Sequence, residues 1–522
     1  MVALVALIVT IGFGVMLHDA FTSRSVVVEA FDSPPALVAR GWTGKVLATG
    51  LLDELTRLQE ATIISNQSKR SLSNAWSREV QIAVPETGIS IGEISRLLRD
   101  RFGHDLHISG DLVETTTGTL ALTVRGDEVP RKTFYENADG LEMLTLKAAE
   151  YVYAQAQPSH WAKYLVDSHR YDEAIAFTPS AFARTEKAER PRLLLSEGLA
   201  LNEIGKPREA LALFRQAADL GQDYFGAPMM VASNSADLGD EEGAWRASEN
   251  MRHLAGGRPG RAPEKFYGIS DILTGNLLPM LNAFLKDYES SLDEGYVDGQ
   301  EEIIIADIEA RLHDHAASEL ALHQAKADAS DPSIAAHIHF VRGELAEAAG
   351  DKARAVEEMD AFGAICANSP FLSNCPGNTC WIAPAEEAVG HPEKADAVLK
   401  TGGQFVDCYR FRADILDGRG DWLGAQKTYE EAVALAPDLP AGYYSWGLAL
   451  AKHGDLQSAL AKLRDANQRG PHWADPLKAW GDVLVKQGNT KEALAKYDEA
   501  LKYAPNWKQL HEARDGVAKQ KA

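Results

Sequence analysis

The chain has 522 residues, and its 75 acidic side chains outnumber its 53 basic ones to give a formal net charge of −22 at pH 7. Such a surface repels nucleic acid backbones and anionic lipid headgroups, so the composition argues against a DNA- or RNA-binding function. The simplest explanation of the charge is solubility. Hydrophobic residues make up 45% and charged residues 25% of the chain, which argues against wholesale disorder. The length predicts two or more structural units.

The chain opens with an apolar run from Val2 to Leu17. The run is slightly shorter than the roughly 20 residues of a typical spanning helix. It could instead be the hydrophobic region of a signal peptide, but no basic residue precedes it and Asp19-Ala20-Phe21 is a poor cleavage site. We therefore expect residues 1–23 to be a transmembrane anchor rather than a cleaved signal segment. On this interpretation the protein crosses the inner membrane once and its soluble part lies in the periplasm.

Residues 24–155 predict a small α/β domain with a mixed sheet. The segment 25–31 alternates and is rich in β-branched residues, which indicates a strand, whereas 37–63 has the apolar periodicity of a long helix. Ser90 and Glu93 form a capping box for a second helix, and Asn137 or Asp139 caps the last one. The polar segment 65–77 predicts a loop. The predicted order is strand 25–31, helix 37–63, strand 79–84, helix 90–102, strands 104–113, 119–124 and 131–135, and a helix ending near 155.

A period of 34 residues runs through the last third of the chain. Proline recurs at 437, 471 and 505, glycine at 420, 454 and 488, and alanine at 425, 459 and 493 and again at 432, 466 and 500. The glycines predict left-handed helix caps, the alanines predict close contact between two helices, and the prolines predict helix ends. Each unit is therefore a helix–turn–helix hairpin, which must stack on its neighbours to bury its apolar face.

This pattern resembles that of tetratricopeptide (TPR) repeats. The residues that follow the consensus most closely are Leu477, Trp480, Gly481, Gly488, Ala493, Tyr497, Ala500 and Pro505. Repeats are clear at 406–439, 440–473 and 474–507, and weaker copies lie at 191–224, 225–258 and 336–369. The resemblance implies a mainly α fold, in which a TPR α-solenoid of stacked helix hairpins follows the small α/β domain.

These patterns divide the chain into seven segments. They are a transmembrane anchor or signal segment at 1–23, the small α/β domain at 24–155, N-terminal TPR-like repeats at 156–258, a linker with irregular helices at 259–300, degenerate TPR-like repeats at 301–405, three clear TPR repeats at 406–507 and a C-terminal tail at 508–522. The Gly- and Pro-rich stretch 256–261 marks the start of the linker.

All four cysteines lie between positions 366 and 408. Cys375 and Cys380 are separated by Pro-Gly-Asn-Thr, a turn-forming sequence that would let the two meet. We therefore predict a disulfide between them in an oxidising compartment. A zinc site is one alternative, although only this pair has a suitable spacing, and free buried thiols are another.

No catalytic motif accompanies the repeats. Gly41-Trp-Thr-Gly-Lys45 lacks the spacing of a phosphate-binding loop and is better explained as an irregularity in the predicted helix. The pairs His313/His315 and His337/His339 lie in predicted helices, where residues two apart point in divergent directions. The sequence therefore predicts no enzyme activity, no catalytic residue, no cofactor and no metal.

The best candidate site is the concave face of the repeats. In TPR proteins the first helix of each hairpin lines this groove, and the matching positions here are Arg410, Asp414, Tyr444, Leu448, Lys452, Lys478, Asp482 and Lys486. This mixture of charged and apolar side chains suits an extended peptide or a helix with charged ends. Lys478 and Lys486 resemble the basic pair of TPR domains that clamp a terminal carboxylate, although Asp482 stands where those domains carry Asn.

We therefore predict a membrane-anchored TPR scaffold that binds a protein or peptide partner in this groove. It would contact the membrane through its N-terminal apolar segment and would not bind nucleic acid. The alternative is the sensory half of a bacterial membrane signalling protein, because the 24–155 segment resembles the small domains that precede TPR arrays in membrane-tethered regulators. In that case residues 24–155 would form the ligand site.

Overall fold

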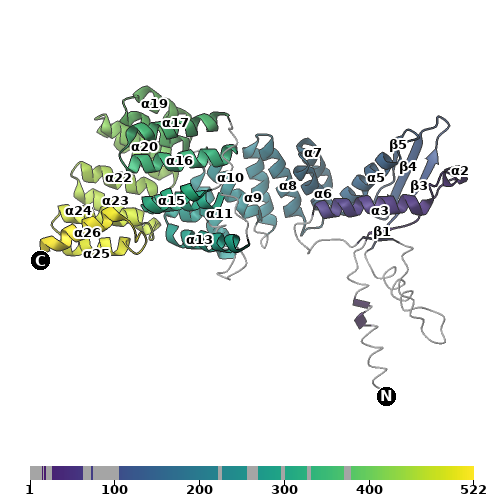
Figure 1. Cartoon of the computed structure of the whole chain (residues 1–522), viewed down its shortest axis with the longest axis horizontal. Helices are drawn as coiled ribbons and strands as arrows, with labels where there is room; N and C mark the ends of the chain where they lie inside the picture. Colours follow the sequence, from purple (N-terminus) through teal and green to yellow (C-terminus); the bar gives the residue numbers. More distant parts are fainter. Residues whose placement is uncertain are drawn as a thin grey trace, which may run out of the picture. The chain divides into compact units, whose positions relative to one another are not determined.

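The computed structural model describes residues 26–62, 72–74, 105–221, 226–254, 268–294, 300–325, 331–368, 375 and 378–521, together with positions 14, 15, 17 and 18 (Figure 1). The chain forms two compact units, unit 1 from Met1 to Ile204 and unit 2 from Gly205 to Ala522. The predicted anchor at 1–23 lies outside the described residues apart from those four positions. Across the described parts of the chain, no helix combines the length and the apolar character needed to cross a membrane.

Unit 1 begins with a five-stranded mixed sheet in the order β2-β1-β3-β4-β5. The strands are β1 (Val26–Val28), β2 (Leu72–Asn74), β3 (Leu106–Glu114), β4 (Leu120–Gly126) and β5 (Lys132–Glu136). β1 pairs in parallel with β2 and β3, and β4 pairs in antiparallel fashion with β3 and β5. Buried positions alternate along most of β3, and the helices α3 (Gly44–Ala61) and α5 (Leu141–Ala156) pack against the sheet. The predicted small α/β domain with a mixed sheet is confirmed.

The single helix predicted at 37–63 is wrong, because the chain forms two helices there, α2 (Pro35–Val38) and α3. The break lies at Gly41-Trp-Thr-Gly-Lys45, where Gly41 has a φ of +88°. The backbone of Phe31 also approaches Gly44 so closely that a Cβ on this glycine would lie 1.7 Å from the Phe31 carbonyl oxygen. These residues are therefore a helix irregularity, as predicted. The left-handed backbone favours glycine at 41, and the packing of the chain on itself requires glycine at 44.

Other local features of unit 1 also differ from the prediction. The loop predicted at 65–77 is wrong over Leu72–Asn74, because these residues form β2 beside β1, and so short a polar strand carries little periodicity. Neither Asn137 nor Asp139 caps α5, which begins after Gly140 without a side-chain cap. The Asn137 Oδ1 instead accepts a hydrogen bond from the Asp139 N–H at 3.1 Å, which forms a turn before the helix. The predicted strand 79–84 and helix 90–102 lie outside the described residues.

Three helices continue unit 1 beyond the sheet, namely α6 (Pro158–Asp167), α7 (Tyr171–Phe182) and α8 (Arg190–Glu203). They pack against one another, and α6 also packs against α5. One hydrophobic cluster extends from Val28 and Ile108 in the sheet to Trp161, Leu165 and Ala200 in the helices. The sheet and the first helical hairpin therefore share a single core.

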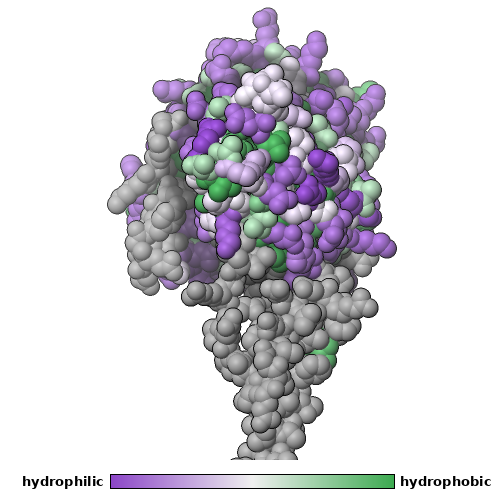
Figure 2. All heavy atoms as spheres, turned by 90° about the vertical axis from the view of Figure 1, so that its right-hand side faces the viewer, coloured by the Kyte–Doolittle hydropathy of each residue, from purple (hydrophilic) through white to green (hydrophobic). Residues whose placement is uncertain are grey.

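The surface shown in Figure 2 is mainly hydrophilic among the residues that are coloured. Apolar residues form only small groups between the polar ones. Small exposed apolar groups are normal on a soluble surface, so this face indicates no extended hydrophobic interface.

Unit 2 is built from helices that pack as successive pairs. Its elements are α9 (Pro207–Leu220), α10 (Gly226–Asp237), α11 (Glu241–Leu254), α12 (Gly268–Thr274), α13 (Leu277–Glu294), α14 (Gln300–Arg311), α15 (His315–Gln324), α16 (Pro332–Ala348), α17 (Lys352–Asn368), η2 (Asn378–Trp381), α18 (Ile382–Ala388), α19 (Pro392–Thr401), α20 (Val406–Gly418), α21 (Trp422–Leu435), α22 (Ala441–Lys452), α23 (Leu456–Arg469), α24 (Ala474–Lys486), α25 (Thr490–Ala500) and α26 (Lys508–Lys521). The three clear repeats predicted from the sequence are the pairs α20–α21, α22–α23 and α24–α25.

The periodic residues of these three pairs have the predicted roles. Gly420, Gly454 and Gly488 follow the first helix of each pair with φ values of +87°, +82° and +82°. The Tyr497 ring packs directly on Gly481, because a Cβ on that glycine would lie 2.4 Å from Tyr497 Cε1. The alanine at 493 is fully buried in the same contact region. The small residues therefore set how closely the two helices of a hairpin approach.

Unit 2 also folds back on itself, so that α11–α15 lie beside α20–α26 (Figure 1). Polar contacts join residues far apart in the chain. They are Val406 N to Glu241 Oε2 at 3.2 Å, Arg246 to Asp438 at 3.2 Å, His472 to Asn276 at 2.9 Å, His313 to Asp475 at 3.0 Å and Asn506 to Asp314 at 2.7 Å. We call these five pairs the closure contacts. The solenoid therefore completes a turn and meets itself, a feature that the 34-residue period does not predict.

Candidate functional site

The eight predicted groove residues lie on the first helices of the three clear repeats. Arg410 and Asp414 are on α20, Tyr444, Leu448 and Lys452 on α22, and Lys478, Asp482 and Lys486 on α24. Within each helix they are four residues apart, so they share one helical face. The structure divides them into three groups by what they contact.

Two of the acids in this set hold their own hairpins together. The Tyr429 hydroxyl donates a hydrogen bond to Asp414, and the Tyr497 hydroxyl donates to Asp482 Oδ1 at 2.7 Å. Both tyrosines come from the second helix of the same hairpin and are buried. Asp482 also accepts a bond of 2.9 Å from Lys478 Nζ. Lys478 is therefore already paired, which weakens its resemblance to a carboxylate clamp.

A second group faces solvent. Leu448 is 41% exposed, which is high for a leucine, and Lys452 and Lys486 are also exposed. Lys452 Nζ and His453 Nε2 both contact the Asp417 carboxylate, at 2.6 Å and 2.5 Å. Burial would raise the pKa of Asp417, but the hydrogen bonds from Lys452 and His453 outweigh it and lower that pKa. The exposed members of the predicted groove are therefore one apolar side chain and two lysines, of which Lys452 is paired with Asp417.

The third group, Arg410 and Tyr444, lines a cavity of about 390 Å³ inside unit 2. We call it the central cavity. Arg410 Nε donates to Asp407 Oδ1 at 2.6 Å, and one of its terminal nitrogens donates to Ser445 Oγ at 3.3 Å. The Tyr444 ring lies 4.8 Å from the Trp473 ring, and burial raises the pKa of its hydroxyl. These two residues thus belong to an internal site rather than to the open groove.

The cysteines form two disulfides that differ from the predicted one. Cys366 pairs with Cys375 and Cys380 pairs with Cys408, so the predicted Cys375–Cys380 pair is wrong. The short spacing favoured a local pair, but the α18–α19 hairpin brings the start of α20 back to η2 and places Cys408 next to Cys380. All four cysteines are bonded, so neither the zinc site nor the free thiols are present.

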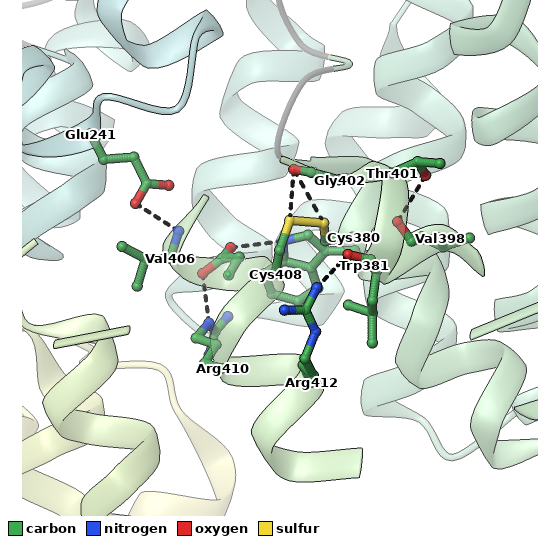
Figure 3. Close-up of a disulfide and its surroundings, with 12 residues drawn as sticks. Glu241, Cys380, Trp381, Val398, Thr401, Gly402, Val406, Cys408, Arg410 and Arg412 are labelled. Carbon is green, nitrogen blue, oxygen red and sulfur yellow. Dashed lines mark hydrogen bonds and ion pairs between the residues drawn. A yellow bond between two sulfur atoms is a disulfide. The ribbon is translucent and has the colours of Figure 1, made fainter. Parts of the chain in front are cut away.

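The Cys380–Cys408 disulfide supports one wall of the central cavity (Figure 3). Trp381 follows Cys380 in the chain, Asp407 precedes Cys408, and Trp381 Nε1 donates to Asp407 Oδ2 at 3.0 Å. The same aspartate holds Arg410. Gly402 packs against the sulfurs, since a Cβ there would lie 2.2 Å from Cys380 Sγ. The disulfide therefore fixes the position of two polar groups in the wall.

The helical position predicted for both His-x-His pairs holds for His337 and His339 but is wrong for His313, which lies in the turn between α14 and α15 with a φ of +62°. His337 bonds to Asp307 at 3.3 Å and His339 to Glu358 at 2.7 Å. His313 reaches Asp475 and stacks on Trp507 with the ring centroids 3.7 Å apart. Within the described residues, no three His, Cys, Asp or Glu side chains are placed to hold a metal ion.

Several residues that line the central cavity were not predicted from the sequence. Glu241, Glu344 and Trp473 come from degenerate repeats or from the connection between repeats, where no consensus position identifies them. They converge only because α11–α16 lie opposite α20–α24. In the sequence, Glu344 stands out only as an acidic residue within the largely apolar helix α16. Such residues are too common to identify a site.

Glu241 gives unit 2 a pH-dependent stability. Burial, with the nearby charge of Asp407, raises the pKa of Glu241 to about 8. Between about pH 4.5 and about pH 8, Glu241 keeps its proton in the folded chain but has lost it in the unfolded chain. Glu241 therefore destabilises the fold more and more as the pH rises through this range. We expect Glu241→Gln, which keeps an acceptor for the Val406 N–H, to raise the melting temperature more at about pH 9 than at about pH 5.

The melting temperature should rise by about 2–4 °C for each kcal/mol of destabilisation that the substitution removes. Thermal denaturation of the full chain at the two pH values measures it, with Glu492→Gln as the control because Glu492 is exposed on α25. An equal shift at both pH values would contradict the role given to Glu241.

Comparisons with known proteins agree with the repeats. A family model described as tetratricopeptide repeat matches residues 474–507, and a second with the same description matches residues 412–472. No curated protein sequence matches the chain. Residues 412–507 thus contain tetratricopeptide repeats, and the predicted mainly α solenoid is confirmed.

The chain is also similar, at low sequence identity, to several solved structures. The Cut9–Hcn1 hetero-tetramer of APC/C is 13% identical over 74% of this chain and 80% of that one, with a TM-score of 0.42. Yeast Tom70 is 12% identical over 69% and 94%, with a TM-score of 0.31. The TPR2AB domain of yeast Sti1, solved with pHSP90, is 13% identical over 63% and 98%, with a TM-score of 0.21. Such distant similarities carry no argument about function.

Proposed function

We propose that this chain is a membrane-anchored scaffold that binds a protein or peptide partner on the concave face of its three C-terminal TPR repeats. A protein-interaction scaffold is plausible from the repeats themselves. The observation that carries the finer proposal is Leu448, which is 41% exposed on the face of α22 that also carries the exposed Lys452. Lys486 is exposed at the matching position of α24. An exposed apolar side chain with lysines on the same face of the repeats suits an amphipathic or acidic segment of a partner.

The anchor in this proposal rests on the apolar run Val2–Leu17. The alternative function, a sensory half with its ligand site in residues 24–155, stays a prediction from the sequence. Among the residues of this segment that the structure describes, no contact favours it over the scaffold.

Crosslinking in native membranes, followed by purification of the chain and mass spectrometry, tests the proposal. The groove variant carries Leu448→Asp and Lys486→Glu. The matched control carries Leu423→Asp and Lys427→Glu on α21, where the leucine is 79% exposed and the lysine side chain 78%. Both variants change the net charge equally, so only the position of the change differs.

We expect a discrete partner with the wild type and the control, and at least about a tenfold lower yield with the groove variant, as for loss of an interface anchor. Recovery of the wild-type chain from the membrane fraction only after detergent extraction would support the anchor. A partner retained equally by both variants would remove the groove from the proposal, and a chain found only in the aqueous fraction would remove the anchor.

A further inference from the structure

The central cavity is a candidate binding site separate from the exposed part of the groove. Its walls come from α11–α16 on one side and from η2, α20, α22 and the start of α24 on the other. Its volume of about 390 Å³ lies in the range of small-ligand sites. Ile272, Glu347 and Ala348 are exposed members of its lining, so the cavity opens to solvent beside the C-terminal end of α16.

The lining carries more acid than base. Five carboxylates line the cavity, from Glu241, Glu344, Glu347, Asp407 and Asp475, against the two guanidinium groups of Arg311 and Arg410. His313 and His315 also line it, and burial lowers the pKa of His315, so that imidazole adds little positive charge. Burial raises the pKa of Glu241 and of Glu344 to about 8, so both hold a proton at neutral pH when the cavity is empty. A bound cation would stabilise their charged forms, so the lining favours a cationic ligand.

Most of these groups already have partners. Arg410 and Trp381 both donate to Asp407, His313 shares a hydrogen bond with Asp475, and the Val406 N–H donates to Glu241. Arg311 Nε donates to Asp307 Oδ1 at 2.7 Å. The internal pairing thus uses both arginines and three of the five acids.

Glu344 and Glu347 are the two acids outside this pairing, and of the two only Glu347 is exposed. Glu344 Oε2 is inaccessible to solvent and has no hydrogen-bond partner among the described residues. Burial raises the pKa of Glu344 to about 8, with Asp307, Glu347 and Asp407 acting in the same direction and Arg311 against it. A buried carboxylate without a partner costs free energy that a cationic donor would recover. Glu347 lies three residues further along α16, on the same helical face and at the rim.

The aromatic lining distinguishes an organic cation from a metal ion. Trp381, Tyr444 and Trp473 all line the cavity, and aromatic faces attract ammonium groups. A metal ion would need several ligands held at short distances, and the described residues offer no cluster of three such groups. Trp473 is held firmly, because a Cβ on Gly275 would lie 2.3 Å from its ring.

We propose that the central cavity binds an alkylammonium group, with Glu344 as its main anionic contact and the aromatic side chains around its methylene groups. The group could belong to a free amine or to a lysine side chain of a bound protein. This inference does not rest on the proposed groove, since Leu448, Lys452 and Lys486 lie outside the cavity lining.

Isothermal titration of the full chain distinguishes the two sources. One arm uses 1,5-diaminopentane, and the other uses a lysine-containing peptide together with the same peptide acetylated at the lysine Nε. Glu344→Gln keeps the shape of the side chain and removes its charge. The matched control is Glu302→Gln, because Glu302 also has a buried Oε2 without a partner but lies outside the cavity.

We expect saturable binding by the wild type and by Glu302→Gln, and binding weaker by about tenfold or more in Glu344→Gln, as for loss of a charged hydrogen bond. Binding of the diamine identifies a free amine, whereas binding of the peptide alone, abolished by acetylation, identifies a partner's lysine. Glu347→Gln at the exposed rim should weaken binding about two- to fivefold, and it keeps the test valid if Glu344→Gln does not fold.

The absence of saturable binding in both arms would overturn the proposal. Equal affinity of Glu344→Gln and the wild type would also overturn it. The groove variant Leu448→Asp with Lys486→Glu should bind the amine as the wild type does, so loss of the partner in crosslinking and loss of the amine are separate results.

Discussion

Replacing Cys380 and Cys408 by serine should lower the stability of the region from η2 to α20 by about 3–4 kcal/mol. The disulfide closes a loop between residues 28 positions apart, and the entropy that it removes from the unfolded chain grows with loop length. Both cysteines are fully buried, and the Gly402 carbonyl oxygen lies 3.1 Å from Cys408 Sγ, so it can accept a bond from a serine hydroxyl. The loss should therefore reflect the missing cross-link more than an unsatisfied polar group.

Hydrogen exchange of the full chain, read by mass spectrometry, measures this loss region by region. Protection should fall in residues 378–418 while α24–α26 keep theirs. The control is Cys366→Ser with Cys375→Ser, whose loop spans only 9 positions and should cost less, about 2–3 kcal/mol. Unchanged protection around η2 and α20 would show that the disulfide does not stabilise the cavity wall.

Replacing Tyr497 by alanine should destabilise the last hairpin by about 3–5 kcal/mol, as for large-to-small changes of a buried aromatic residue. The ring is 2% exposed and fills the space above Gly481, where no other side chain can enter. Its hydroxyl also donates to Asp482 at 2.7 Å. The mutation would therefore remove both the packing and the polar bond between α24 and α25.

Tyr497→Phe separates the two contributions. It keeps the ring and removes the hydrogen bond to Asp482 Oδ1, so it should cost only about 1 kcal/mol, because Lys478 still donates to Oδ2 and the half-exposed carboxylate can be solvated. Exchange rates of amides in α24 and α25 measure both variants. If the alanine and phenylalanine variants were equally stable, packing on Gly481 would not be what holds the hairpin.

The repeats were predictable because each of their positions has one local physical cause. Gly454 is required by a left-handed cap, Ala459 by a close helix contact and Tyr497 by the space beside a small residue. These causes act within one hairpin or between adjacent hairpins, so a 34-residue period records them. The strand β3 was predictable for a similar reason, since its alternation of buried and less buried positions is local.

Features that depend on distant parts of the chain were not predictable in the same way. The disulfide partner of Cys380 depends on how α18 and α19 return the chain, and the start of α3 at Gly44 depends on Phe31 crossing nearby. The predicted groove mixed three environments, because Arg410 and Tyr444 face across unit 2 while Leu448 faces solvent. The spacing of residues in the sequence predicts which of them share a helical face, but it does not predict what lies opposite that face.

The closure contacts have a consequence for how the repeat array can evolve. A linear solenoid tolerates the gain or loss of a repeat, because each unit contacts only its neighbours. In unit 2, Glu241 meets Val406 and Asn276 meets His472, across 165 and 196 positions. Adding or deleting one hairpin between Asp314 and Val406, the stretch that separates the two members of every closure contact, would displace one set of partners from the other and break all five bonds together. The closure contacts therefore constrain the number of hairpins in this stretch.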